Sequence, residues 1–235
     1  MDDFVDMNII GYPYFEKLDL AYKNPSHLMH KKMKLVLNYV RRGESLIDIG
    51  CGTGEFIIQL KDRFTRLVGI DTSSHAIEFT ARRVGKDRNI LLECGELGSF
   101  HFPTEHFDVC LCLDVLEHVK DLSSLLQEIH RILRPGAEMI VTVPNWYDII
   151  MSGILRIDPL HINTFTPWRW MRLLKRVGFK IKFYRAVDFP ILKSDLLARE
   201  IYFLGMGILI VAIRQPDHDN ASQRESLLNK AELIK

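Results

Sequence analysis

The chain has 235 residues, of which 47% are hydrophobic and 26% are charged; this favours a single α/β domain with one sizeable core over two smaller domains. Its 31 basic and 30 acidic side chains leave a net charge of +1, so the overall charge favours neither a nucleic acid nor a membrane surface as a partner. The four cysteines have no metal-site spacing, and we expect them to be free thiols in a reducing cytoplasm.

No targeting or membrane-spanning segment is expected. Asp2, Asp3 and Asp6 stand where a signal peptide would have a basic start and an apolar core. The longest apolar run, residues 201–213, is shorter than the roughly 20 residues that span a bilayer. The sequence therefore predicts a cytoplasmic protein, and it does not indicate an oligomeric state.

The first 25 residues are expected to form an N-terminal arm. They are aromatic and irregular in pattern, and they fit either a flexible arm or a cover over a ligand. Ser26 can cap a helix over residues 26–42, whose apolar positions fall mainly on one face. The basic residues near the opposite side are expected to face solvent; they are His30, Lys31 and Lys32.

Residues 46–56 read Leu-Ile-Asp-Ile-Gly-Cys-Gly-Thr-Gly-Glu-Phe, and the rest of the chain is best interpreted around them. The apolar run with one acid, Asp48, predicts a strand buried on both faces of a parallel sheet. Three glycines then permit a tight turn with positive φ angles, and helical spacing begins at Glu55. Such a loop brings backbone N–H groups against a ligand at the carboxyl edge of the sheet. The glycines are Gly50, Gly52 and Gly54.

A second acid follows the next strand. Residues 67–70 are apolar and lead into Asp71. An acid at the end of the second strand can accept hydrogen bonds from both hydroxyls of an adenosine ribose. Asp71 therefore favours an adenosine-containing ligand. The alternative is that it helps to cap the following helix, for which Thr72 and Ser73 also offer hydroxyls.

Two more strands are predicted near the middle of the chain. Residues 90–94 form the third strand and lead into Gly95-Glu96-Leu97. Residues 107–113 form the fourth strand, which opens with Phe-Asp-Val and is followed by Asp-Val-Leu-Glu-His-Val at residues 114–119.

The second half continues the alternation of helices and strands. A helix over residues 122–133 ends at Arg-Pro-Gly, and a strand over residues 139–143 follows. A helix over residues 166–178 precedes two strands, residues 179–184 and 205–213. Such an alternation builds a parallel sheet with right-handed crossovers.

Two insertions interrupt this pattern, at residues 144–165 and 187–200. Loops of that length in a compact domain are usually functional, and we expect both to act as lids over a substrate. Residues 169–185 between them are locally basic, but no aromatic interleaving repeats there, so a solvated face is favoured over an RNA-binding patch. Residues 215–235 are polar and are expected to form a frayed tail.

The loop from Asp48 to Gly54 and the string around residues 107–119 resemble the motifs of class I S-adenosylmethionine-dependent methyltransferases, in particular small-molecule enzymes of the ubiquinone-biosynthesis type. The resemblance runs from about residue 26 to residue 214 and departs mildly at Glu96, where Asp is more usual. It implies a Rossmann-like α/β fold: a mostly parallel sheet with an antiparallel edge hairpin and helices on both faces. It also implies S-adenosylmethionine as the cofactor, bound by Asp48, Gly50, Cys51, Gly52, Gly54, Asp71, Thr72, Glu96, Leu97 and Leu113.

The reaction that the resemblance implies is in-line transfer of a methyl group to a small-molecule acceptor, at oxygen rather than at nitrogen or carbon. An alcohol or phenol acceptor needs a general base. His118 is the first candidate, because its neutral imidazole can take a proton near pH 7 and it follows the fourth strand. His161, in the first expected lid, is the second candidate. The residues do not name the acceptor.

A metal-dependent variant of this reaction is also conceivable. If the chain is helical there, Asp114, Glu117 and His118 share one face and could hold a divalent cation. Metal-independent relatives carry a similar string, so no metal is included in the prediction.

Two other classes of function stay open. A nicotinamide-dependent oxidoreductase is disfavoured, because its fingerprint is Gly-x-Gly-x-x-Gly and the sequence has no catalytic Tyr-x-x-x-Lys pattern. A methyltransferase-like protein that binds cofactor or partner without catalysis is disfavoured, because the glycine loop, Asp71 and the fourth-strand motif are all intact.

Overall fold

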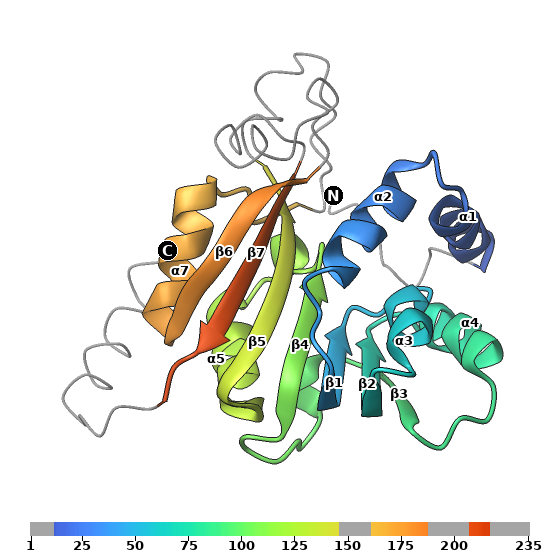
Figure 1. Cartoon of the computed structure of the whole chain (residues 1–235), viewed down its shortest axis with the longest axis horizontal. Coiled ribbons are helices and arrows are strands. Elements are labelled where there is room, and N and C mark those ends of the chain that lie inside the picture. Colours follow the sequence, from blue (N-terminus) through green and yellow to red (C-terminus); the bar gives the residue numbers. More distant parts are fainter. Residues whose placement is uncertain (1–11, 146–160, 188–206, 217–235) are drawn as a thin grey trace, which may run out of the picture.

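The computed structural model describes residues 12–145, 161–187 and 207–216. They form a seven-stranded sheet in the order β3-β2-β1-β4-β5-β7-β6 (Figure 1). The first five strands are parallel, and β7 runs antiparallel to both of its neighbours. The strands are β1 (Gly43–Ile49), β2 (Phe64–Asp71), β3 (Ile90–Cys94), β4 (Phe107–Leu113), β5 (Leu133–Pro144), β6 (Phe179–Val187) and β7 (Gly207–Arg214).

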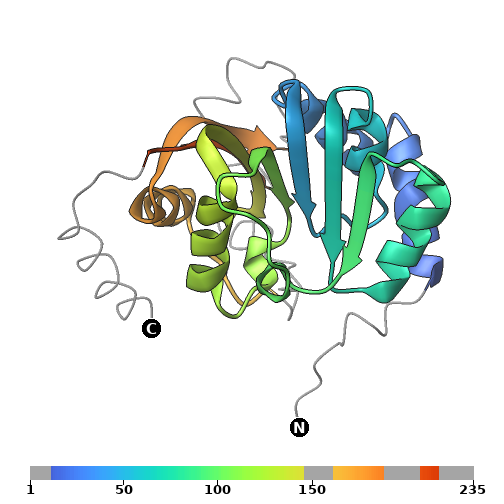
Figure 2. The same cartoon turned by 90° about the horizontal axis from the view of Figure 1, so that it is seen from below.

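Helices cover both faces of this sheet (Figure 2). One face packs against α2, α3 and α4 and the other against α5 and α7, while α1 packs on α4. No helix in the described ranges is long and apolar enough to cross a membrane. The helices are α1 (Tyr12–Lys23), α2 (Leu28–Leu37), α3 (Glu55–Leu60), α4 (Ser74–Val84), α5 (Leu122–Ile132) and α7 (Pro167–Val177), with short 3-10 turns η2 (Leu97–Ser99) and η3 (Leu116–His118).

The burial of β1 explains its unbroken apolar sequence. Ile47 and Ile49 belong to the core on the α5 and α7 side, and Leu46 belongs to the core on the α2 and α3 side. Successive side chains of a strand alternate between faces, so a central strand covered on both sides needs apolar residues at both sets of positions. The predicted fold class is confirmed, including the mostly parallel sheet and the antiparallel edge hairpin.

The N-terminal part of the chain differs from the expectation. Residues 12–23 are not irregular but form α1, because Phe15 packs against Phe79 of α4. The following helix is shorter than expected and is capped by His27, whose side chain accepts the N–H of Met29. The serine before it, which was the predicted cap, does not have this role.

The elements of the second half agree more closely with the sequence. Thr166 caps α7 by accepting a backbone N–H of its first turn, and Gly178 ends the helix with a φ of 110°. In contrast, β5 begins earlier than predicted, because Leu133 already pairs with Phe107 before a register shift in the two strands.

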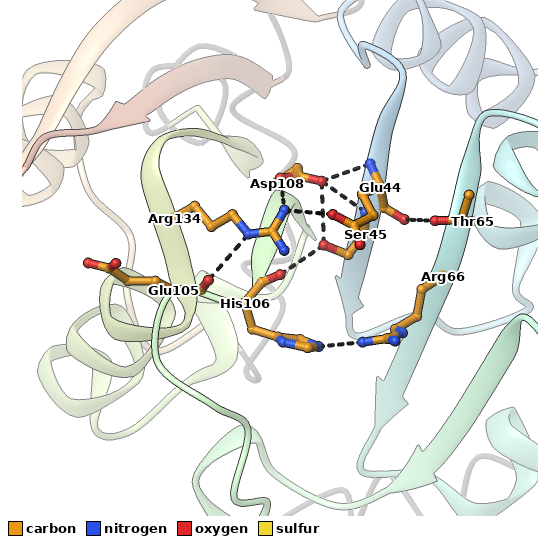
Figure 3. Close-up of polar contacts among 8 residues, drawn as sticks. All are labelled: Glu44, Ser45, Thr65, Arg66, Glu105, His106, Asp108 and Arg134. Atoms are coloured by element: carbon orange, nitrogen blue, oxygen red, sulfur yellow. Dashed lines mark hydrogen bonds and ion pairs between the residues drawn. The ribbon is translucent and has the colours of Figure 1, made fainter.

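A polar network connects the amino ends of β1, β4 and β5 (Figure 3). The Oδ2 atom of Asp108 accepts the backbone N–H groups of Glu44 and Ser45 at 2.8 and 2.9 Å. Its Oδ1 atom accepts a hydrogen bond from Arg134 at 2.7 Å. Partial burial would raise the pKa of Asp108, but these hydrogen bonds and the Arg134 charge together lower it. The carboxylate therefore stabilises the fold at neutral pH, and this contribution is lost as the pH falls through the lowered pKa.

Candidate active site

The carboxyl ends of the central strands open onto a cavity of about 1180 Å³. Open α/β sheets bind their ligands at this edge. Most of the residues predicted from the sequence line the cavity; they are Asp48, Gly50, Cys51, Gly52, Asp71, Thr72, Glu96, Leu97, Leu113, His118 and His161. Gly54 is the exception, since it is not among the lining residues.

The three glycines of the loop have different surroundings. All three have positive φ angles, 73° at Gly50, 52° at Gly52 and 70° at Gly54, which other residues adopt only with strain. A Cβ on Gly50 would lie 2.4 Å from Val115, and one on Gly54 would lie 2.3 Å from Thr80. A Cβ on Gly52 would meet nothing within 4 Å. Gly50 and Gly54 therefore serve the fold, whereas Gly52 leaves space toward the cavity.

Side chains of α4 hold the glycine loop in place. The hydroxyl of Thr80 donates to the backbone oxygen of Gly52 at 2.8 Å. Arg83 donates to the backbone oxygen of Thr53 at 2.7 Å and forms an ion pair with Asp19 of α1 at 3.0 Å. The same arginine therefore connects the loop to the helix that closes one side of the cavity.

Asp71 holds the loop from the end of β2. Its Oδ2 atom accepts the N–H of Gly52 and its Oδ1 atom accepts the N–H of Ser73, both at 2.9 Å. Burial raises the pKa of Asp71, and these two hydrogen bonds oppose the shift. Each carboxylate oxygen has a second lone pair that could accept from a ribose hydroxyl. The geometry is therefore compatible with both sequence interpretations, a local turn and a ribose acceptor.

Asp48 is buried at the carboxyl end of β1, with 2% of its surface exposed. Its Oδ2 atom makes no hydrogen bond with any residue that the structure describes. Burial, and next the charge of Asp71, raise the pKa of Asp48 to about 8. A buried carboxyl group without a partner is costly for the fold, and a cation bound beside it would offset that cost.

Some lining residues were not expected from the sequence. Lys32 of α2 was expected to face solvent, but its side chain is only 15% exposed and forms an ion pair with Asp114. No local pattern could reveal this pair, since the two residues are 82 positions apart. The aromatic content of the N-terminal arm was a signal for the lining residues of α1, which are Tyr14, Phe15, Leu18 and Tyr22.

Asp114 does not share a helical face with Glu117 and His118, so that expectation is wrong. Its φ of 54° places it in the left-handed region, and η3 begins only after it. Its N–H donates to the backbone oxygen of Thr142, and its carboxylate accepts from the hydroxyl of the same residue, both at 2.9 Å. With Lys32 as its ion-pair partner, Asp114 is committed to other contacts.

His161 instead completes a cluster with Glu117 and His118. Each of the three side chains offers one donor atom, and these atoms lie within 4.8 Å of one another. The two imidazole rings have centroids 4.9 Å apart, while Glu117 is only 1% exposed. The two histidines named as candidate bases from the sequence therefore lie together, on the wall of the same cavity as the glycine loop.

The mostly parallel sheet, the positive-φ glycine loop after β1 and the acid at the end of β2 define a Rossmann-like domain with a site for an adenosine-containing ligand. Residues 47–141 match the family model described as a methyltransferase domain. The chain therefore contains a segment that matches a methyltransferase domain, within a Rossmann-like fold.

Several proteins similar to this chain are methyltransferases by name. A probable S-adenosylmethionine-dependent methyltransferase of Mycolicibacterium smegmatis is 24% identical over 163 residues, 69% of this chain and 62% of the relative. The malonyl-[acyl-carrier protein] O-methyltransferase of Serratia marcescens is 26% identical over 139 residues, 55% of this chain and 51% of the relative. An S-adenosylmethionine-dependent methyltransferase from Mesorhizobium loti shares the fold, with a TM-score of 0.59 and 21% identity over 78% of this chain and 96% of that one. The chain spans between 21% and 62% of the length of the first four curated relatives that it matches.

S-adenosylmethionine is the cofactor that the matched methyltransferase domain and the fold imply, and the residues fit it. The molecule has an ammonium group, a sulfonium and two ribose hydroxyls. Asp48 offers a buried oxygen without a partner in the described part of the chain, which suits a cationic group. Gly52 leaves open space beside the loop, and Asp71 retains lone pairs for the ribose.

Asp71→Ala is expected to weaken S-adenosylmethionine and S-adenosylhomocysteine binding alike, by about ten- to 150-fold, because both ligands carry the same ribose. Loss of a hydrogen bond to a charged group costs about 1.5 to 3 kcal/mol. Calorimetric titration of the variant gives both affinities. Asp87→Ala is the matched control, since Asp87 accepts the N–H of Asn89 in a similar turn but does not line the cavity. Very different responses to the two ligands would exclude a ribose contact for Asp71.

Proposed function

We propose that the protein transfers the methyl group of S-adenosylmethionine to an oxygen atom of a small-molecule acceptor. One observation carries this proposal: a single cavity is lined both by the cofactor residues and by the cluster of Glu117, His118 and His161. S-adenosylmethionine supplies a methyl group on a positively charged sulfur, which is already a good leaving group. The main task of the protein is then to align the two reactants, which can lower the barrier by about 7 to 11 kcal/mol.

Oxygen is the proposed nucleophile because a hydroxyl must lose its proton during the transfer, and the cluster offers groups that accept one. A lone pair of the acceptor oxygen forms the new C–O bond while the pair of the C–S bond stays with sulfur. The proton of the hydroxyl leaves toward the cluster, so His118 and His161 are the proposed catalytic residues. One of the relatives described above is an O-methyltransferase by name, which fits this choice.

The two expected lids are part of the proposal. Most of both segments, residues 146–160 and 188–206, lies outside the described residues. The described residues on either side of both gaps line the cavity; they are Pro144, Asn145, His161, Val187 and Gly207. Segments that leave and rejoin the fold at the same cavity are well placed to contact an acceptor. A cavity with this lining suits a small molecule better than a nucleic-acid strand, for which a wider basic surface would be needed.

A cytoplasmic location is also proposed. The four cysteines, Cys51, Cys94, Cys110 and Cys112, are free thiols, which fits a reducing compartment.

The sequence left two alternative functions open. A nicotinamide-dependent oxidoreductase would bind a different ligand, and a binding protein without catalysis would show no turnover. Both differences can be measured.

The test combines calorimetry with turnover. The full chain is titrated with S-adenosylmethionine, S-adenosylhomocysteine and NAD, and transfer of labelled methyl groups is then measured on a panel of alcohols, phenols, carboxylates and amines. We expect binding of the first two ligands, no binding of NAD, and methylated oxygen in the product. His161→Gln should lower turnover without changing S-adenosylhomocysteine affinity, while His101→Gln, at an exposed position outside the cavity, should change neither.

Each contrary result identifies which part fails. Binding of NAD alone would support the oxidoreductase. Binding of S-adenosylmethionine without transfer to any acceptor would support the non-catalytic protein. Methylation of amines only would overturn the choice of oxygen.

A further inference from the structure

Asn163 fixes the segment that carries His161 against η3. Its backbone N–H donates to the backbone oxygen of Glu117 at 3.0 Å. Its side-chain amide donates to the backbone oxygens of Leu116 at 2.9 Å and Val119 at 2.6 Å. Three hydrogen bonds from one residue thus join two segments that are more than forty positions apart in the chain. The nearness of His161 to Glu117 is therefore supported by Asn163, two residues away, through one backbone and two side-chain hydrogen bonds.

The donor set of this cluster is that of a transition-metal site. One carboxylate oxygen and two imidazole nitrogens lie within 4.8 Å of one another, where donors around one Zn²⁺ would be about 3 to 3.5 Å apart. Binding of an ion would therefore draw the three donor atoms closer together. Two histidines with one carboxylate suit Zn²⁺, Fe²⁺, Co²⁺ or Mn²⁺ and leave coordination positions open, whereas Mg²⁺ and Ca²⁺ prefer oxygen ligands throughout.

We propose that Glu117, His118 and His161 bind a divalent transition-metal ion at the acceptor end of the cavity. This ligand set differs from the one that the sequence suggested, because His161 replaces Asp114, which is engaged with Lys32 and Thr142. The three ligands come from two segments, so the site exists only in the folded chain.

The role of the ion rests on the proposed function. A cation with open positions binds the acceptor hydroxyl and lowers its pKa, so that the hydroxyl proton is released to water at neutral pH. The acceptor oxygen then forms its bond to the methyl carbon as the C–S bond breaks. One proton and one neutral thioether are the other products, so charge and atoms balance. In the metal-bound protein the two histidines would act as ligands, and release of the acceptor proton to solvent would replace the proton transfer to the histidines that is proposed above for the metal-free protein.

The test uses Co²⁺, whose visible absorption reports its ligands, and Zn²⁺ in calorimetry, both on the full chain after treatment with a chelator. We expect one ion per chain. Glu117→Gln, His118→Gln and His161→Gln should each weaken binding by about ten- to 100-fold or more. All three variants should keep the S-adenosylhomocysteine affinity of the parent protein, which shows that they are folded.

Two control variants make the assignment specific. His101→Gln removes an exposed histidine outside the cavity and should leave Co²⁺ binding unchanged. Asp114→Asn changes a residue that belongs to the ligand set suggested by the sequence but not to the one proposed here. This variant should also leave Co²⁺ binding unchanged. Absence of binding to the folded parent protein, binding that survives His161→Gln, or binding that needs Asp114 would each overturn the site.

The metal site and the proposed function can fail separately. If chelated protein transfers methyl groups at the full rate while His161→Gln is slow, the histidines act as bases, the metal role is wrong and the methyl transfer stands. If the protein binds Co²⁺ as expected but methylates no acceptor, the metal site stands and the proposed function fails.

Discussion

Gly52→Val is expected to lose S-adenosylhomocysteine binding by at least about 100-fold while the protein stays folded. Gly52 has a φ of 52°, and a Cβ there would meet nothing within 4 Å, so the substitution adds bulk where the structure leaves space for the cofactor. The strain of a β-branched residue at positive φ costs about 1 to 3 kcal/mol, which lowers stability but does not unfold a typical domain. Calorimetry measures the affinity, and thermal unfolding measures the stability.

Variants at two other glycines, Gly54 and Gly85, provide comparisons for Gly52→Val. A Cβ on Gly54 would lie 2.3 Å from Thr80, so Gly54→Val should unfold at a clearly lower temperature than Gly52→Val. The matched control is Gly85→Val at the end of α4, where φ is 67° and the added atom would also meet nothing, but away from the cavity. Because its ψ of −147° lies outside the regions open to other residues, it should lose at least as much stability as Gly52→Val, yet keep its affinity. Normal binding by Gly52→Val would exclude the loop from the cofactor site.

Cofactor binding is expected to release a proton from Asp48, so that affinity rises with pH by up to about ten-fold per unit between pH 6 and pH 8. Burial, and next Asp71, raise the pKa of Asp48 to about 8, so the carboxyl group is protonated in the free protein at neutral pH. A cation bound beside its Oδ2 atom favours the ionised form and lowers that pKa. Protonation and cofactor therefore compete for the same oxygen.

Asp48→Asn separates these two roles. The variant cannot ionise, so its affinity should be lower at pH 8 and independent of pH. The stability of the cofactor-free fold should change in the opposite direction, because the pKa of Asp48 is higher in the folded than in the unfolded state. The contribution of Asp48 to folding stability is therefore present below about pH 4 and is lost as the pH rises toward 8. Without cofactor, Asp48→Asn should therefore be more stable than the parent protein at pH 8.

The measurement is calorimetry with S-adenosylhomocysteine in two buffers of different ionisation enthalpy at pH 7. We expect release of nearly one proton by the parent protein and of none by Asp48→Asn. Asp62→Asn, at an exposed position after α3, should behave like the parent protein. Affinity that stays constant from pH 6 to pH 8 in the parent protein would show that Asp48 is not linked to binding.

The sequence by itself predicted the sheet and the glycine-loop side of the cavity, because both depend on short-range patterns. An apolar run around Asp48 predicts a strand covered on both faces, and three alternating glycines predict a turn; the structure has both. The spacing of Asp71 from that turn follows from the length of one helix and one strand. The strand bounds of β3 and β4 agree with those expected, since each is an apolar segment between clear turn signals.

Only the tertiary structure decided which groups lie together around Glu117. Asp114, three residues before it, is not part of that cluster: its backbone is left-handed, and its carboxylate contacts Lys32 and Thr142. His161 takes its place although it is distant in the chain, because backbone oxygens of η3 accept the hydrogen bonds of a neighbouring asparagine. Contacts between residues so far apart leave no periodic signal in the sequence, and they form only when the strands and helices between them have been placed.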